Sequence, residues 1–458
     1  MIFGLLFLGI VATVLFFAAI GIKVTIEQHQ NSHALDFVRD ILKYIALFLA
    51  VIFFCFGVSG LVAQLIDPNN VAQISKEETA RWLSFVVVGA PVVLLLARWI
   101  KRDFTKNLED IYRPAWQLYL LFSSTFTFAI WFLFLIGSIA DYLRGSANPR
   151  GLASGIVAFV VWLIHFKLLK IHNSLLVNLH RFIGWFAGIT ATLVAIINVI
   201  DVAIRQVSAL ELGRFQFQEA IITAAIAVPT SLFYWQDFET YASALEARIY
   251  RTFAGQAIPA LFATIAATVA VNAIITWSTG AQVYWQDVSS TSATVMVLLP
   301  TILFFRRLVN FYERDEITRI FQYLICGLAM VGLAISIGAL VAGILDSSDN
   351  KDAIIFAASL ALTTFPTWFK TWKNCQFAMA TEFESEHGSP VRRFYLYALI
   401  GVPTIIALGA SVFVVFNFFK ALLIGGLDRI QLSTPLGVLI SMAVVALYHS
   451  RVQRKEFS

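Results

Sequence analysis

The chain has 458 residues, of which 59% are hydrophobic and only 13% are charged. Soluble domains carry about 25% charged and about 45–50% apolar residues. The composition therefore excludes an ordinary soluble domain and indicates an all-α integral membrane protein. The formal net charge of +5 suits contact with anionic lipid head groups on the cytoplasmic side, and we expect no nucleic-acid partner.

Apolar runs long enough to cross about 30 Å of hydrocarbon recur along the whole sequence. Each run is predicted to be a helix, because a lone strand would leave its backbone groups unpaired in lipid. We predict 13 transmembrane helices, at residues 2–22, 41–66, 82–100, 115–141, 152–169, 182–204, 217–235, 253–278, 291–308, 320–345, 353–369, 394–425 and 434–449. The first run is expected to be a retained span, because no basic residue precedes it.

Lysine and arginine residues are distributed unevenly across the predicted membrane. Of 33 such residues, 24 fall on the side that includes the C-terminal tail. Loops rich in Lys and Arg stay in the cytoplasm. We therefore predict a multi-pass protein of the cell inner (plasma) membrane, with its N-terminus outside and its C-terminus in the cytoplasm.

After the first helix the sequence repeats. Pro91, Pro229 and Pro366 lie 138 and 137 residues apart, each inside a predicted span. "LEDIYR" at 108–113 and "LEARIYR" at 245–251 are close copies. A fixed period indicates repeated structural units. The predicted divisions are an N-terminal transmembrane helix with its linker and three four-helix repeats, at residues 1–35, 36–172, 173–314 and 315–458.

Each predicted repeat contains four helices, so every copy starts and ends in the cytoplasm. The copies are therefore expected to be parallel. Many secondary transporters use inverted repeats, although parallel repeats also occur among them. The parallel arrangement weakens a transporter interpretation without removing it.

A candidate structural motif follows each of these prolines. Trp99 and Trp235 follow the first two prolines, and the third copy is the fullest. The third copy reads P-x-W-x-x-x-W-x-x-x-Q, formed by Pro366, Trp368, Trp372 and Gln376. A four-helix membrane unit with this motif resembles a bacterial repeat domain of unknown function. The resemblance covers residues 36–458 and implies an architecture without an activity.

The motif is best interpreted as structural. A proline inside a helix removes a backbone donor and kinks the helix, and tryptophan is favoured at the membrane interface. The alternative is that the motif forms part of a substrate or lipid path. "GWFAG" at 184–188 adds a G-x-x-x-G pattern, which allows close helix approach inside the protein or against another subunit.

Chemistry-bearing residues are sparse in the predicted spans. No carboxylate falls near a midplane, which argues against a proton relay, and no nucleotide-binding or nucleophile motif is present. We expect no enzymatic activity, no cofactor and no metal site. His165 and His449 are weak candidates for haem ligation, because they lie in spans at equivalent places of the first and third copies.

Three classes of function remain open, and one of them, a redox subunit, rests only on the two candidate histidines. The first is a non-catalytic scaffold or accessory subunit that packs against other membrane proteins. The near absence of charged residues from the spans, the short loops and the parallel repeats favour this function. The alternative is a transporter, channel or lipid-handling protein with a path between the repeats. Proline kinks and polar residues near the outer span ends favour that alternative.

Overall fold

The computed structural model confirms an all-helical membrane protein. It describes residues 34–66, 76–106, 114–146, 148–169, 175–208, 214–241, 244–308, 316–346, 351–424 and 429–457. Every regular element in these ranges is helical, and 12 helices are long and apolar enough to cross a membrane. They coincide with the last twelve predicted spans. The predicted span 2–22 lies outside the described residues.

The chain forms two compact units, which divide it as Met1–Val199 with Gly213–Ser243, and as Ile200–Leu212 with Ala244–Ser458. We call them unit 1 and unit 2. Helix α6 contributes residues to both units, since it runs from Leu175 to Val207.

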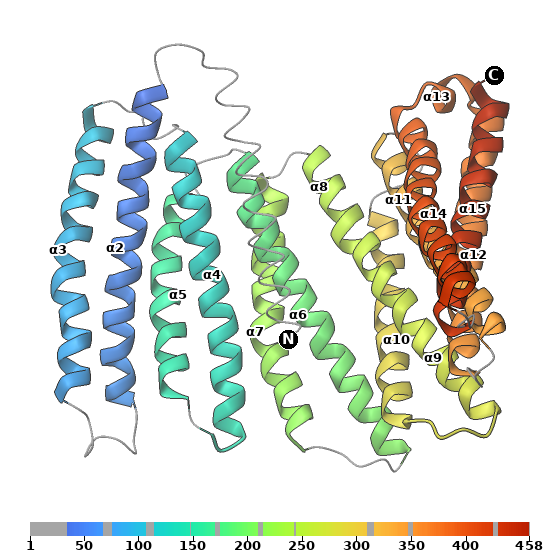
Figure 1. The fold of residues 1–458 in the computed structure, drawn as a ribbon. Helices are drawn as coiled ribbons and strands as arrows, with labels where there is room; N and C mark the ends of the chain where they lie inside the picture. The colour runs from blue at the N-terminus through green and yellow to red at the C-terminus, as the bar shows by residue number, and fades with distance from the viewer. Residues whose placement is uncertain are drawn as a thin grey trace. The chain divides into compact units, whose positions relative to one another are not determined.

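Unit 1 is an antiparallel helix bundle. Its complete helices are α2 (Ala34–Ile66), α3 (Lys76–Lys106), α4 (Pro114–Leu143), α5 (Pro149–Leu169) and α7 (Arg214–Tyr241). Helix α2 packs on α3, α5 and α4, and α4 also packs on α5 and α7 (Figure 1). Helix α4 is the most enclosed of the spans, and half of its most apolar stretch is buried.

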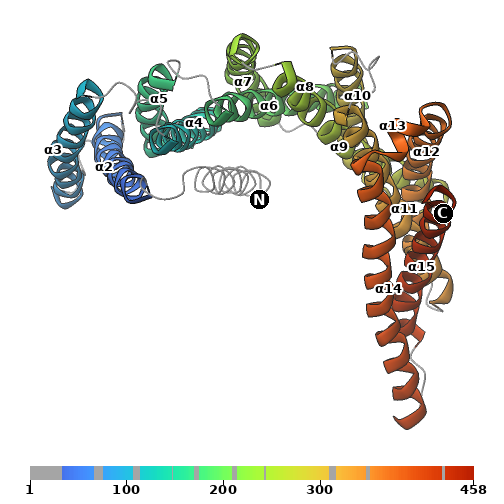
Figure 2. The same cartoon turned by 90° about the horizontal axis from the view of Figure 1, so that it is seen from above.

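Unit 2 contains the rest of the described helices. They are α8 (Ala244–Thr252), a π-helical turn η2 (Phe253–Ala257), α9 (Ile258–Ser278), α10 (Trp285–Leu308), α11 (Glu316–Leu345), α12 (Lys351–Thr381), α13 (Phe383–His387), α14 (Pro390–Ile424) and α15 (Arg429–Phe457). Helix α11 packs on α12, α15 and α14, and α14 runs beside α15 (Figure 2). Helix α9 packs on α10 and α12.

The same packing pattern occurs once in each unit. The order of contacts α3–α2–α5–α4 in unit 1 matches α12–α11–α15–α14 in unit 2. Each unit thus contains a set of four helices, counted in chain order: α2–α5 in unit 1, and α11, α12, α14 and α15 in unit 2. In both sets the first helix packs on the fourth and on the second. Two stretches of sequence far apart along the chain therefore adopt the same helix pairing.

Glycines allow close approach between packed helices. A Cβ added at Gly184 would lie 2.3 Å from the Tyr234 ring, and one at Gly188 would lie 2.8 Å from the Ser231 backbone. Both contacts join α6 to α7 within unit 1. The G-x-x-x-G pattern of α6 therefore serves internal packing, one of its two predicted uses.

The closest backbone approach among these glycines is between α11 and α15. A Cβ added at Gly437 would lie 2.2 Å from the carbonyl oxygen of Gly338. A backbone atom cannot rotate away as a flexible side chain can. The α11–α15 crossing therefore requires glycine at position 437.

We predict that Gly437→Ala destabilises unit 2 by about 1–3 kcal/mol, because the added methyl group forces the two helices apart. Gly409→Ala on α14 is the matched control, since an added Cβ there meets nothing within 4 Å. Thermal unfolding of the purified variants in detergent measures both. Equal melting temperatures for the two variants would contradict the predicted close crossing.

Candidate functional site

The structure gives the three motif prolines similar exposure and the motif tryptophans different exposure. Pro91, Pro229 and Pro366 lie inside α3, α7 and α12, and all three are exposed. Trp99 is 51% exposed, whereas Trp372 is only 5% exposed. The motif of prolines and tryptophans therefore does not form one recurring surface.

The third-copy tryptophan is part of a core. Trp372 packs with Tyr395, Cys326 and Cys375, and its Nε1 donates a hydrogen bond to the Tyr448 hydroxyl at 2.7 Å. Its ring also lies 5.6 Å from the ring of Tyr395. Trp372 joins α12 to α14 and α15, so it is a buried packing residue of unit 2.

The two other members of the third-copy motif are half-buried. Trp368 lies against Tyr448, with ring centroids 6.0 Å apart. Gln376 lines a groove between α12 and α15. Trp235 is also half-buried and its ring lies 5.7 Å from that of Trp185 on α6.

Charged side chains in unit 2 converge at one end of α11, α14 and α15. We call this group the ionic cluster: Glu316, Arg319, Tyr323, Glu386, Arg392 and Glu456. Arg319 Nε donates to Glu386 at 2.8 Å, and the Tyr323 hydroxyl donates to the other oxygen of Glu386 at 3.0 Å. Arg392 binds both oxygens of Glu456, at 2.9 and 2.5 Å.

The ionic cluster is enclosed. The side chains of Arg392 and Glu386 are fully buried, and the Arg392 guanidinium lies over the rings of Tyr323 and Trp372. A bidentate arginine–carboxylate pair fixes orientation as well as distance. Arg392 therefore holds the end of α15 against α14 through Glu456.

Equivalent ion pairs occur at the start of α6 and of α2. Fully buried Arg181 donates to Asp237 and to Asn178, both at 2.8 Å. Lys43 lies 3.1 Å from Asp103 and 3.3 Å from Asp40. In each case the basic residue links the first helix of a set to the second.

These basic residues follow the sequence period. Lys43, Arg181 and Arg319 lie 138 residues apart in turn, and each has a polar partner three positions earlier, at Asp40, Asn178 and Glu316. Sequence reasoning missed this group. The sequence does contain a pattern that could have identified it: a polar residue stands three positions before a basic residue, and this pair recurs every 138 residues.

The candidate histidines have separate surroundings. His165 Nδ1 donates to the Val161 carbonyl at 2.9 Å, and its Nε2 shares a hydrogen bond with the Tyr119 hydroxyl at 2.9 Å. His449 donates through Nδ1 to Val445 O at 2.9 Å, and its Nε2 has no partner among the described residues. Both side chains are buried in aromatic surroundings.

A third buried histidine, His180, lies just outside the predicted span at residues 182–204. His180 lies within α6 and is fully buried. Its ring nitrogens contact Thr125 Oγ1 and the Tyr234 hydroxyl, each at 3.0 Å. Trp162 Nε1 donates to the same hydroxyl at 3.0 Å. This hydrogen-bond network joins α4, α5, α6 and α7 inside unit 1.

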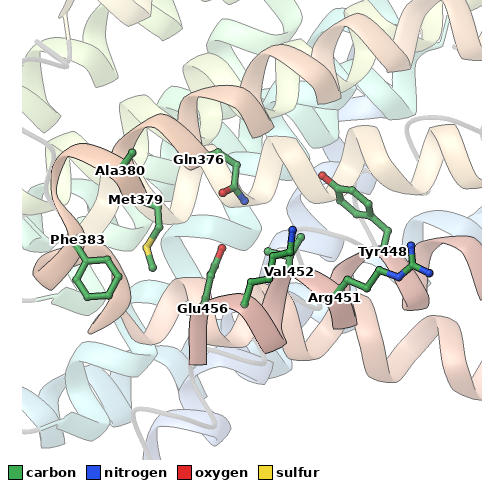
Figure 3. Close-up of a pocket in the computed structure, with 9 residues that line it drawn as sticks. Gln376, Met379, Ala380, Phe383, Tyr448, Arg451, Val452 and Glu456 are labelled. Carbon is green, nitrogen blue, oxygen red and sulfur yellow. The ribbon is translucent and has the colours of Figure 1, made fainter. Parts of the chain in front are cut away.

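Among the described residues, no group of three or more His, Cys, Asp and Glu side chains could hold a metal ion. A groove of about 610 Å³ lies between α12 and α15 beside the ionic cluster. Figure 3 shows Gln376 and Met379 of α12 facing Val452 and Glu456 of α15 across it.

Long apolar helices whose charges pair at the helix ends define a multi-pass membrane protein. A sequence profile described as a domain of unknown function, DUF5671, matches residues 40–164 and 319–448. These regions make up more than half of the chain, so the protein belongs to the DUF5671 family. No curated protein and no solved structure matches the sequence.

The two matched regions confirm that a domain of unknown function occurs twice, in the first and third predicted repeats. They contain the two helix sets with the same packing order. The middle copy and the proline–tryptophan motif stay predictions.

We predict that Glu386→Gln destabilises unit 2 by about 3–5 kcal/mol, because two buried arginines lose a shared carboxylate. Glu384→Gln is the control on the same short helix, and its side chain is exposed. That variant should stay within about 0.5 kcal/mol of the parent. Chemical unfolding in detergent gives both values, and equal stabilities would show that the ionic cluster is not needed.

Proposed function

We propose that this protein is a non-catalytic scaffold or accessory subunit of a membrane protein complex. We further propose one N-terminal span followed by three parallel four-helix repeats, in the inner (plasma) membrane. In this proposal the N-terminus is outside, the C-terminus is cytoplasmic, and the protein has no enzymatic role and no nucleic-acid partner.

One observation carries the scaffold proposal: the buried charged groups near helix ends are paired within their own unit, whereas the exposed middle stretches of the spans are largely apolar. Arg181, Arg319 and Arg392 each bind a carboxylate of the same unit. A span that presents only apolar side chains can bind lipid or another apolar span, and has few groups to bind a polar substrate.

Helix α14 shows this most clearly. Only 11% of its most apolar stretch is buried, and it carries no charged residue between Arg393 and Lys420. Its exposed large side chains include Val402, Ile405, Leu408, Val412, Phe413, Phe416 and Phe419. Gly401 and Gly409 leave open space on the same helix. Such a face suits close packing against a span of another subunit.

The three-repeat arrangement is supported by the recurrence of Lys43, Arg181 and Arg319 at the sequence period, each with a partner three residues earlier. The matching helix order of α2–α5 and of α11, α12, α14 and α15 supports it for the first and third copies.

The pocket inside unit 1 gives little support to the transporter alternative. The pocket among α2, α4 and α5 has a volume of about 70 Å³. A water molecule in the liquid occupies about 30 Å³, so this pocket suits one or two waters. It is lined mostly by apolar side chains such as Phe48, Ile52 and Phe126.

We predict that the tagged protein, extracted from its native membranes in mild detergent, co-purifies with other subunits in fixed ratio. Gly409→Leu should remove them, because leucine fills the open space on α14 that a neighbouring span would occupy. Gly137→Leu on α4 is the control, since a Cβ there also meets nothing within 4 Å. Native mass determination reads the result, and a parent protein that is only ever monomeric would refute the scaffold proposal.

We also predict the orientation of the C-terminus. A fluorescent protein fused after Ser458 should be fluorescent in a bacterial host, whereas alkaline phosphatase at the same position should be inactive. The reason is the excess of Lys and Arg on the side of the C-terminal tail. An active phosphatase fusion would reverse the proposed topology.

A further inference from the structure

The groove between α12 and α15 combines charge, hydrogen-bond donors and an apolar wall. Its volume is about 610 Å³. Two stripes of side chains line it, one from α12 and α13 and one from α15 (Figure 3). The lining residues are Gln376, Met379, Ala380, Phe383, Tyr448, Arg451, Val452, Lys455 and Glu456.

The groove carries unneutralised positive charge. Its one acid, Glu456, is bound by Arg392 through both oxygens. Arg451 and Lys455 lie four residues apart on one face of α15, and both are exposed. Neither has an ion-pair partner among the described residues. The two basic side chains therefore favour an anionic ligand at this edge of the groove, which we call its rim.

Neutral donors complete the polar side of the groove. Tyr448 accepts a hydrogen bond from Trp372 through its hydroxyl oxygen, so its own hydrogen is available to a ligand. The Gln376 amide adds two N–H groups. Phosphate oxygens accept several such bonds at once, and arginine matches their geometry with two parallel donors.

The other side of the groove is apolar, formed by Met379, Phe383 and Val452. The groove lies near the C-terminal end of α15, a span that ends at Glu456. A free phosphate ion has no apolar group that could pack against this wall. A phospholipid presents a phosphate and a hydrocarbon chain at that same depth, and basic pockets between spans bind such head groups.

We propose that the α12–α15 groove binds the head group of an anionic phospholipid. Arg451 and Lys455 hold the phosphate, Tyr448 and Gln376 donate hydrogen bonds to the head group, and the glycerol and upper acyl chain lie against Met379, Phe383 and Val452. The site is independent of whether α14 binds another subunit.

The test uses the purified full-length protein in nanodiscs of phosphatidylcholine with or without phosphatidylglycerol, followed by native mass spectrometry of the lipids that it retains. The parent should retain phosphatidylglycerol in preference to phosphatidylcholine. The double variant Arg451→Gln with Lys455→Gln should weaken that retention by about ten-fold or more, since each basic residue near a lipid surface contributes strongly to binding.

The matched control is Arg306→Gln with Arg307→Gln. These residues are an exposed basic pair in the last turn of α10 and do not line the groove. The control should retain phosphatidylglycerol as the parent does. An equal loss in both double variants would overturn the proposal, because it would mean that net surface charge alone attracts the lipid.

A second variant tests the head-group contacts at constant charge. Gln376→Leu keeps the volume of the side chain and removes its donors, so retention of phosphatidylglycerol should fall while the melting temperature without that lipid stays that of the parent. Unchanged retention in this variant and in the Arg451/Lys455 variant would overturn the site. Complete displacement of the lipid by inorganic phosphate would overturn the lipid assignment in favour of a small-anion site.

Discussion

The structure depends on one constraint: a charged side chain that is buried among the helices requires a partner of opposite charge from another part of the same unit. Arg181 on α6 binds Asp237 near the end of α7, and Arg319 on α11 binds Glu386 on the short helix α13. Arg392 extends this principle to the last helix by binding Glu456. Breaking such a pair leaves a buried charge in a medium of low dielectric constant, which costs far more than losing one pair at a surface.

The ion pairs explain the position of other features of unit 2. Because Arg392 fixes the end of α15 against α14, Trp372 is enclosed between these helices and donates its indole N–H to Tyr448. The same pair neutralises Glu456 and leaves Arg451 and Lys455 as the charged rim of the groove. Buried Arg392 therefore supports the core around Trp372 and also shapes a groove that is open at the protein surface.

The helical fold could be predicted almost completely from the sequence, because hydrocarbon forces each apolar run to satisfy its own backbone. The candidate site was harder to predict. The motif tryptophans look alike in the sequence, yet Trp372 is buried and Trp99 is exposed. His180 lies outside the predicted span at residues 182–204. The structure buries both His180 and Arg181, since Asp237 neutralises the arginine and Thr125 and Tyr234 satisfy the imidazole.

The sequence by itself determined the class of protein, twelve of its spans, the repeat period and the excess of basic residues on one side, because these follow from local composition and from spacing along the chain. Only the tertiary structure decided which charges pair, which tryptophan is buried and where a groove forms. Glu386 and Glu456 lie 67 and 64 residues from the arginines that bind them, Arg319 and Arg392. Nothing local at either end of such a pair identifies its partner, so the packing of the helices has to bring the two together.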